Sequence, residues 1–430
     1  MKAKKVLIFV VCLLLLSGIM AFAEGTKVEE KEVTLLLFSH FVPAHDKEIQ
    51  RIVDAWSASS GVKTRIDFIS DVELESKFTS EASSGAGHDI VALRDFVSYI
   101  YEDILSDVSP SIKVLQSQSG KVLRLGVEAS YVNNRWKSVP WYHQSFPMVY
   151  RKDHCAQVGY SVDKMNRLTV DEFLDMAKKL DKIGHPVGIP ISSCPDSNAC
   201  LTPFLWAFGG SMFEGKNKIV INSKETRDAL QYIAELSRYM PKEVKGWDNA
   251  GNNLFMLSGV GAVSANPPSI YAAAHKDKMV FASEIYHAPF PAGKAGSYRF
   301  SGVWSLGVPE FSKNKKEALD LIKFIMKRDN FIALVEASNG YDQPLYEGLQ
   351  GHTIWSANPA LSAYEPASEN LFPIGWPGPN AFPTKASVRA QLLYILPTMF
   401  SKVVVGESTP DQAIAWAESE LKRLVEEEPE

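Results

Sequence analysis

The chain has 430 residues, with 45 lysines and arginines against 50 aspartates and glutamates, four cysteines and 46% apolar residues. These values exclude a disordered, a collagen-like and a disulfide-dense chain. At about 100–200 residues per domain, the length predicts two or three domains.

The first 23 residues have the pattern of a cleavable signal peptide. Three lysines within residues 1–5 precede an apolar run over 6–16, and the small residues Ala21 and Ala23 follow. We expect cleavage after Ala23 and a periplasmic or otherwise extracytoplasmic location. The alternative, a membrane anchor, has only 18 residues over 6–23, whereas a spanning helix needs about 20.

The mature chain is acidic. Removal of residues 1–23 takes away three lysines and no acidic residue, so 42 basic and 50 acidic residues remain, a formal charge of −8. Because no basic block and no second long apolar run follow, we expect no nucleic-acid partner and no membrane span. We expect a soluble monomer.

Three cysteines remain after cleavage, in a compartment that favours disulfides. Cys194 and Cys200 flank a short polar segment, 195–199, that we interpret as a loop. A disulfide between them is one reading, and two free thiols with a buried Cys155 are the other. No metal site is predicted here, because nothing completes a ligand set with His185.

The first 100 residues alternate between strand and helix patterns. A continuous apolar run predicts a strand over 33–38, and apolar spacing predicts a helix over 46–60 that ends at Gly61. Strands are predicted over 62–69 and 88–93. This alternation indicates a parallel sheet with crossover helices.

Three proline-containing segments, 139–150, 288–293 and 340–345, are interpreted as crossings between two α/β halves. The first appears too rich in proline for a central strand. Other elements are predicted from caps and periodicity: helices after Thr169, after Asn222, over 313–327 and after Thr409, and a strand over 304–309.

The order of these features resembles the maltose-binding-like, sugar-binding family of extracytoplasmic solute-binding proteins that serve ABC importers. The resemblance covers nearly the whole mature chain. It is carried by VTLLLFSHF at 33–41, SSGAGHDIVAL at 83–93, VPWYHQSFPMVYRKD at 139–153, LTVDEFLDMAKKL at 168–180, FLWAFGGSMF at 204–213, VINSKETRDALQYIAEL at 220–236, PFPAG at 289–293, SKNKKEALDLIKFIM at 312–326 and STPDQAIAWAESEL at 408–421.

The resemblance implies an α/β, two-lobed periplasmic-binding-protein fold of type II. Each lobe is expected to be a mostly parallel sheet flanked by helices, with a hinge between the lobes. We expect the first lobe to contain 24–141 and 290–340, and the second 142–289 and 341–430. The implied function is capture of a sugar or oligosaccharide for an ABC importer, without a cofactor.

Candidate ligand-binding residues follow strand ends and crossings, because sites in open α/β sheets lie beyond the carboxyl ends of strands and at domain interfaces. Aromatic rings suit the apolar face of a sugar, and polar groups suit its hydroxyls. The candidates are His40, Phe41, Arg94, Asp95, Trp141, Tyr142, Trp206, Trp247, Asn266, Trp304, Tyr341 and Asp342.

Enzyme and metal patterns are weak by comparison. The chain lacks GxSxG, HExxH and GxxxxGK[ST] motifs, and His40 and His45 are interpreted as loop residues rather than metal ligands. A secreted carbohydrate-active enzyme stays open as an alternative. So does a non-sugar solute such as a glycerol phosphate, since Arg94 suits an anion as well as a hydroxyl pair.

Overall fold

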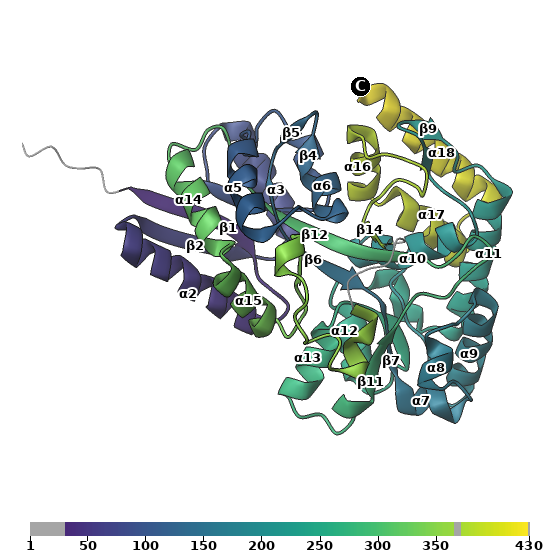
Figure 1. Ribbon diagram of the computed structural model, residues 1–430. Helices are drawn as coiled ribbons and strands as arrows, with labels where there is room; N and C mark the ends of the chain where they lie inside the picture. The colour runs from purple at the N-terminus through teal and green to yellow at the C-terminus, as the bar shows by residue number, and fades with distance from the viewer. Residues whose placement is uncertain (1–30, 365–370, 429–430) are drawn as a thin grey trace, which may run out of the picture.

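The computed structural model describes residues 31–364 and 371–428, which form two lobes (Figure 1). The predicted signal peptide lies outside these residues. Within the two described ranges, no helix has both the length and the apolar character that a membrane crossing needs.

The first lobe is built on a seven-stranded mixed sheet with the order β13-β6-β12-β3-β1-β2, and β14 pairs with β12. The first three strands of the chain are parallel, as predicted, whereas β12 runs antiparallel to both β3 and β6. The strands are β1 (Glu32–Phe38), β2 (Lys63–Ile69), β3 (Ile90–Arg94), β6 (Val139–Phe146), β12 (Arg299–Gly307), β13 (Gln343–Pro344) and β14 (Leu371–Pro373).

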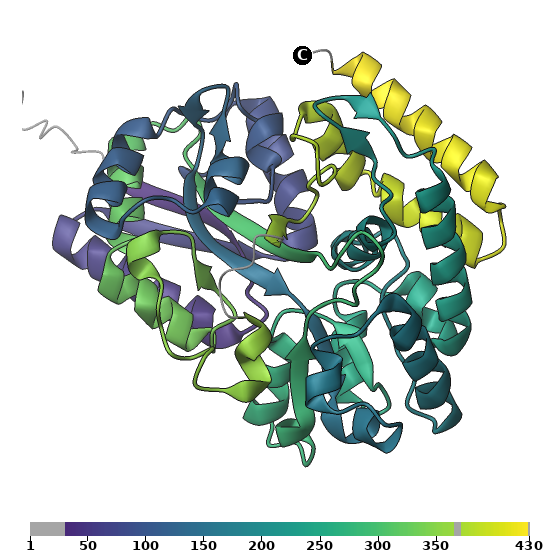
Figure 2. The ribbon, with the colours of Figure 1, turned by 45° about the vertical axis from the view of Figure 1, so that its right-hand side comes forward.

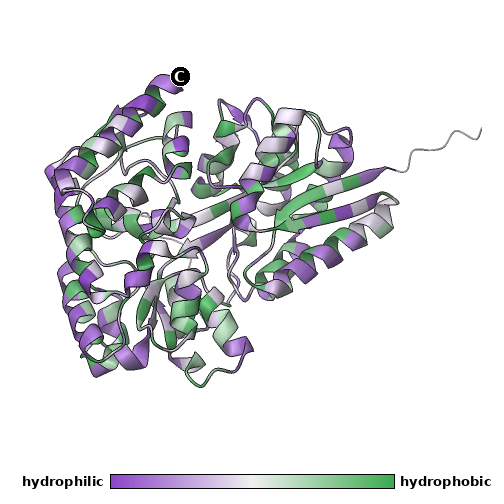
Figure 3. Ribbon diagram, turned by 180° about the vertical axis from the view of Figure 1, so that it is seen from behind, coloured by the Kyte–Doolittle hydropathy of each residue, from purple (hydrophilic) through white to green (hydrophobic). Residues whose placement is uncertain are grey.

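Helices cover both faces of this sheet. The chain moves from β1 to β2 in one direction and from β2 past β1 to β3 in the other, so right-handed crossovers place α2 and α3 on opposite faces. Strands β1 and β3 are largely apolar, and α2 turns its polar side outward (Figure 3). The helices are α2 (Pro43–Ser60), α3 (Asp71–Ser84), α4 (Val97–Ile100), α5 (Ser109–Ser119), α6 (Arg124–Ser130), α14 (Lys315–Ile325) and α15 (Arg328–Ala337).

Strand β6 corrects the interpretation of 139–150 as too rich in proline for a central strand. It lies between β13 and β12. Proline is tolerated because the register shifts beside it: Ser305 pairs with Pro140 and Trp304 with Tyr142, so Trp141 is an extra residue, a β-bulge.

The second lobe contains a three-stranded sheet in which β7 (Met148–Arg151) lies between β10 (Val263–Ala265) and β11 (Ile285–Ala288). Both pairings are antiparallel, so the expectation of a mostly parallel sheet is wrong for this lobe. Its strands are short and are joined through helical segments. These are α7 (Lys152–Gln157), α8 (Val162–Met165), α9 (Val170–Lys182), α10 (Pro195–Ala207), α11 (Lys224–Leu236), α12 (Gly251–Leu257), α13 (Ser269–Lys276), α16 (Lys385–Leu392), α17 (Ile395–Val404) and α18 (Pro410–Glu427).

The predicted helix starts mostly hold. Thr169 forms a capping box with Glu172 at α9, and Thr409 forms one with Gln412 at α18. Helix α11 begins one residue later than predicted, because Ser223 accepts the hydrogen bond from the amide of Thr226. Two hairpins complete the fold: β4 (Tyr131–Val132) with β5 (Arg135–Trp136), and β8 (Phe213–Glu214) with β9 (Lys218–Ile219).

Two apolar cores show where the chain crosses between lobes. One core draws on 33–142 and 303–371, and the other, apart from Phe96, on 146–300 and 374–424. The first crossing therefore lies within β6 and the second within β12, and Figure 2 shows these two strands running side by side toward the second lobe.

The chain makes the other two crossings later in the sequence than predicted. Phe290 is still buried in the second core, so the chain crosses about ten residues after 288–293. Tyr346, Trp355 and Tyr364 are buried in the first core, so the segment from 341 to 364 belongs to the first lobe by its packing. Large aromatic side chains within and after the proline-containing segments decide both boundaries.

Candidate functional site

A pocket lies between the lobes and takes its walls from both. From the first lobe and the crossing strands come Phe41, Asp71, Arg94, Asp95, Gln144, Phe146, Gly302, Trp304 and Tyr341. From the second lobe come Pro195, Asp196, Asn249, Asn253, Asn266, Pro267, Ser269 and Ile374.

The first lobe supplies its residues from the carboxyl ends of parallel strands. Phe41 follows β1, Asp71 begins the helix after β2, and Arg94 ends β3. These three strands end at the same edge of the sheet, which is where ligand sites form in open α/β sheets. The same rule would have identified Asp71 from the sequence.

Asp95 is held in a strained backbone conformation. Its φ is 49°, in the left-handed region. Its amide donates to the carbonyl of Val303 at 2.6 Å, and its Oδ1 accepts from the amide of Val303 at 3.0 Å, so β12 fixes it. Burial raises the pKa of its carboxyl to about 6 against the opposing effect of Arg94.

A chain of polar contacts connects the lobes across the pocket. Arg94 donates to Asp71 Oδ2 at 3.1 Å, and the side-chain amide of Asn249 donates to the same oxygen at 2.8 Å. Gln391 of α16 reaches Asp95 Oδ2 at 3.4 Å. Two aspartates of the first lobe thus contact two amides of the second.

Asp196 contributes a second buried carboxylate near the start of α10. Its Oδ2 accepts from Asn252 at 2.8 Å, and Asn252 also donates to the carbonyl of Ala265. Burial raises the pKa of Asp196 to about 7, and the charge of Asp71 adds to the shift.

Trp304 presents an aromatic ring to the pocket. Phe38 stacks on it with ring centroids 4.0 Å apart, and its Nε1 donates to Gln144 Oε1 at 3.0 Å. Because Phe38 covers one face of the indole, a ligand could stack only on the other. Phe41 and Tyr341 bring two further rings.

A second hollow adjoins the pocket and shares part of its wall. The common residues are Asp71, Arg94, Asp95 and Pro195. Beyond them the second hollow is lined mainly by apolar and aromatic side chains from α3, the end of β3 and α16, with Glu75 and Gln391 as polar groups. The cleft therefore consists of two adjoining hollows.

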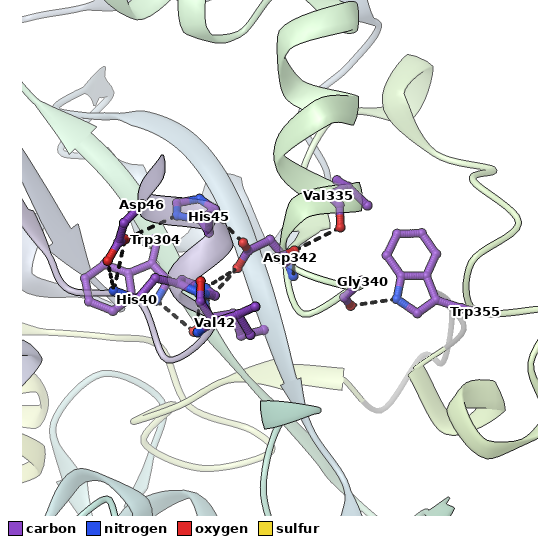
Figure 4. Close-up of polar contacts among 11 residues, drawn as sticks. His40, Val42, His45, Asp46, Trp304, Val335, Gly340, Asp342 and Trp355 are labelled. Carbon is purple, nitrogen blue, oxygen red and sulfur yellow. Dashed lines mark hydrogen bonds and ion pairs between the residues drawn. The ribbon is translucent and has the colours of Figure 1, made fainter. Parts of the chain in front are cut away.

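The structure brings six of the twelve predicted residues together in the pocket: Phe41, Arg94, Asp95, Asn266, Trp304 and Tyr341. The predicted residues His40 and Asp342 lie behind it, paired at 3.3 Å (Figure 4).

The other four predicted aromatic residues pack elsewhere. Trp141 and Tyr142 are buried in the first core, and Trp206 is buried in the second against Phe300. Trp247 packs on Phe255, and its loop carries Asn249 to the pocket instead. Sequence alone does not tell a core ring from a pocket ring.

Of the two readings for Cys194 and Cys200, the structure has the free thiols rather than the disulfide. Cys194, Cys200 and Cys155 are buried free thiols. The segment 195–199 is the first part of α10 rather than a loop, and Cys194 Sγ lies 3.3 Å from the hydroxyl of Ser197. The same segment supplies the pocket residue Asp196. Asp196 was not predicted, because the segment was interpreted as a loop from the sequence.

The charge of the pocket limits its chemistry. Three carboxylates, Asp71, Asp95 and Asp196, face one guanidinium, and Arg94 is already engaged by Asp71 and Asp95. Carboxylates accept hydrogen bonds from hydroxyls, side-chain amides both donate and accept them, and aromatic rings stack on apolar faces. The pocket suits a polar, hydroxyl-rich molecule better than an anion.

These features define the two-lobed fold of the periplasmic binding proteins, with a pocket between the lobes. The chain belongs to the bacterial extracellular solute-binding protein family, whose model matches residues 43–330. A probable ABC transporter-binding protein of Deinococcus radiodurans is 25% identical over 326 residues, which cover 71% of this chain and 74% of that protein.

Solved structures share the fold. The maltose-bound MalE3 of T. maritima has a TM-score of 0.79 at 20% identity and covers 91% of this chain and 99% of its own. The GacH receptor of Streptomyces glaucescens, solved with acarbose, has a TM-score of 0.77 at 19% identity. The match covers 93% of this chain and 100% of that receptor. A sugar transporter from Arthrobacter chlorophenolicus with bound laminaribiose has a TM-score of 0.79 at 15% identity. The match covers 91% of this chain and 99% of that protein.

Proposed function

We propose that this protein is an extracytoplasmic receptor that binds a sugar or oligosaccharide in the inter-lobe cleft and delivers it to an ABC importer. The observation that carries the proposal is the pocket lining, in which Trp304, Phe41 and Tyr341 stand among three carboxylates and several side-chain amides from both lobes. The sugars bound by MalE3 and by the Arthrobacter protein support it.

Binding is proposed to act through hinge closure. A ligand that touches both lobes binds the closed state better than the open one and so shifts the equilibrium toward it. The hinge would lie in the three segments that cross between lobes, and the transporter would recognise the closed form. The contact between Asn249 and Asp71 already links the lobes in this way.

The ligand is proposed to be neutral and to extend beyond one sugar unit. An anion such as a glycerol phosphate would meet three carboxylates and a guanidinium that is already paired. A longer ligand would extend toward the adjoining hollow, which shares Asp71 and Arg94 with the pocket. No catalytic step is proposed for the buried carboxylates.

A thermal-shift and calorimetric screen tests the proposal. Maltose, maltotriose, laminaribiose, their monosaccharides and a glycerol phosphate are compared, because a ligand that binds only the folded state raises the melting temperature. We expect an oligosaccharide to raise it and to be recovered intact. Hydrolysis that is lost in Asp95→Asn or Asp196→Asn would support the enzyme alternative, and binding of the glycerol phosphate alone would contradict the sugar assignment.

A further inference from the structure

Three buried side chains converge behind the pocket: His40 and His45, which flank the start of α2, and Asp342, which precedes β13 (Figure 4). Their side chains are at most 3% exposed. One ligand atom from each lies within 4.8 Å of the others. Residues about 300 positions apart in the chain meet here.

Several polar atoms of this cluster lack hydrogen-bond partners among the described residues. These are both ring nitrogens of His45 and Oδ2 of Asp342. The Tyr142 hydroxyl and the Trp141 indole N–H also lack one there, and both rings contact His45. Buried polar atoms are normally satisfied, so this concentration of unsatisfied groups suits a bound ion or water.

We propose that His40, His45 and Asp342 bind one divalent transition-metal ion of the Zn²⁺ type. Imidazole nitrogen and carboxylate oxygen are the donors that Zn²⁺ takes in proteins, at about 2.0–2.2 Å. Two such donors on a tetrahedral ion lie about 3.4 Å apart. Here His40 Nε2 is 3.3 Å from Asp342 Oδ1, and His45 Nε2 is 3.6 Å from Asp342 Oδ2.

The backbone of Val42 lies beside Nδ1 of His40, the ring nitrogen that would not hold the ion. A ligating histidine donates its other ring N–H to a carbonyl or carboxylate, and Nδ1 of His40 lies 3.3 Å from the carbonyl of Val42. The amide of Val42 donates to Nδ1 at 2.9 Å, which places the ring proton on Nε2 while no ion is bound. An ion on Nε2 would require the other tautomer, in which Nδ1 carries the proton and donates to the carbonyl, and the amide of Val42 would give up its bond.

The carboxylate is held in place by its own partners. Gln144 Nε2 donates to Asp342 Oδ1 at 2.8 Å, which leaves Oδ2 facing His45. The preceding turn is fixed by Gly340 at a φ of 74° and by Trp355 Nε1, which donates to the carbonyl of Gly340 at 2.8 Å. A small inward movement of one imidazole then completes the set of three ligands.

The ion would have a structural role next to the ligand pocket. Gln144 lines the pocket and donates to Asp342, so the site lies one hydrogen bond from the cleft. It would tie the end of β1, the start of α2 and the approach to β13 together. This inference does not depend on which solute the cleft binds.

Metal analysis of the full mature protein tests the site. The protein is stripped with a chelator, incubated with ZnCl₂, dialysed and analysed by mass spectrometry for metal. We expect about one zinc per chain, and a visible d–d absorption spectrum when Co²⁺ replaces zinc. Both measurements use the protein without substitutions. If it neither retains zinc nor gives the Co²⁺ spectrum, the proposal is overturned, independently of the results for the variants.

Variants place the ion. His45→Gln and Asp342→Asn should each lower zinc affinity by more than about tenfold, with the fold checked by circular dichroism. His185→Gln is the matched control, because His185 stacks on His154 in the second lobe at 3.5 Å, away from the cluster. Zinc binding that survives His45→Gln and Asp342→Asn but falls in the control would also overturn the assignment.

Discussion

The side-chain amide of Asn249 in the second lobe donates a hydrogen bond of 2.8 Å to Asp71 in the first, and Arg94 donates to the same carboxylate oxygen. One oxygen thus receives donors from both sides of the cleft. The two lobes are in polar contact at the place where the proposed ligand would bind.

Asn249→Ala should shift the ligand-free protein toward a more open form. A hydrogen bond to a charged group contributes about 1.5–3 kcal/mol, so its loss changes the ratio of closed to open molecules by about tenfold or more. Small-angle X-ray scattering should record a larger radius of gyration. Asn166→Ala, at an exposed position on the second lobe, is the control, and an unchanged scattering profile for Asn249→Ala would contradict the prediction.

Trp304→Ala should weaken sugar binding by about tenfold or more, because an aromatic contact contributes about 0.5–1.5 kcal/mol in addition to the burial of its apolar area. Trp141→Phe should leave the affinity unchanged and lower only the melting temperature, since Trp141 is buried in the first core. Calorimetry measures the affinity and thermal melting measures the stability of each variant. Equal loss of affinity in both variants would show that packing, rather than contact, determines binding.

Asp196→Asn should stabilise the protein at alkaline pH and leave it unchanged near pH 4. The pKa of Asp196 is about 7 in the folded protein and about 3.9 in an unfolded chain. The folded protein therefore binds more protons between these values, and stability is lost as the pH rises through 7. We expect a gain of about 2–4 kcal/mol at pH 8 for the variant.

Thermal melting at pH 4, 6 and 8 measures this effect. Asp163→Asn serves as the control, because the Asp163 side chain is 90% exposed. Asp95 is present in the wild type and in both variants. The effect of its raised pKa on stability therefore cancels when the variants are compared with the wild type. A stability gain that does not grow with pH would show that the carboxyl of Asp196 is not protonated in the folded state at low pH.

Reducing agent should not change the melting temperature of the mature protein. Cys155, Cys194 and Cys200 are free and buried, and burial raises the pKa of the Cys194 and Cys200 thiols. Thiolates are the reactive form, so alkylation should be slow in the folded protein and reach three sites after denaturation. A mass two units low before reduction would instead reveal a disulfide.

The sequence predicted well whatever depends on local periodicity and caps. The strand over 33–38, the helix that ends at Gly61 and the capping boxes at Thr169 and Thr409 are present, because each depends on residues a few positions apart. The rule on strand ends also placed Phe41, Arg94 and Asp95 in the pocket.

The rest of the pocket depends on long-range packing. Trp141 and Trp206 were indistinguishable from pocket residues in sequence, and only their burial in separate cores removes them. Asp196 was missed because 195–199 begins a helix that the cysteine spacing had suggested was a loop. Asn249 reaches the cleft from a loop, which no strand pattern indicates.

The extra residue in β6 has a consequence for the evolution of this protein. Side chains alternate along a strand, so loss of the bulge at Trp141 would turn Gln144 to the opposite face of the sheet. Both Trp304 and Asp342 would then lose their shared partner in one deletion. Insertions and deletions between Val139 and Phe146 should therefore be selected against more strongly than substitutions there, and homologues of different strand length should carry a different polar group at this point.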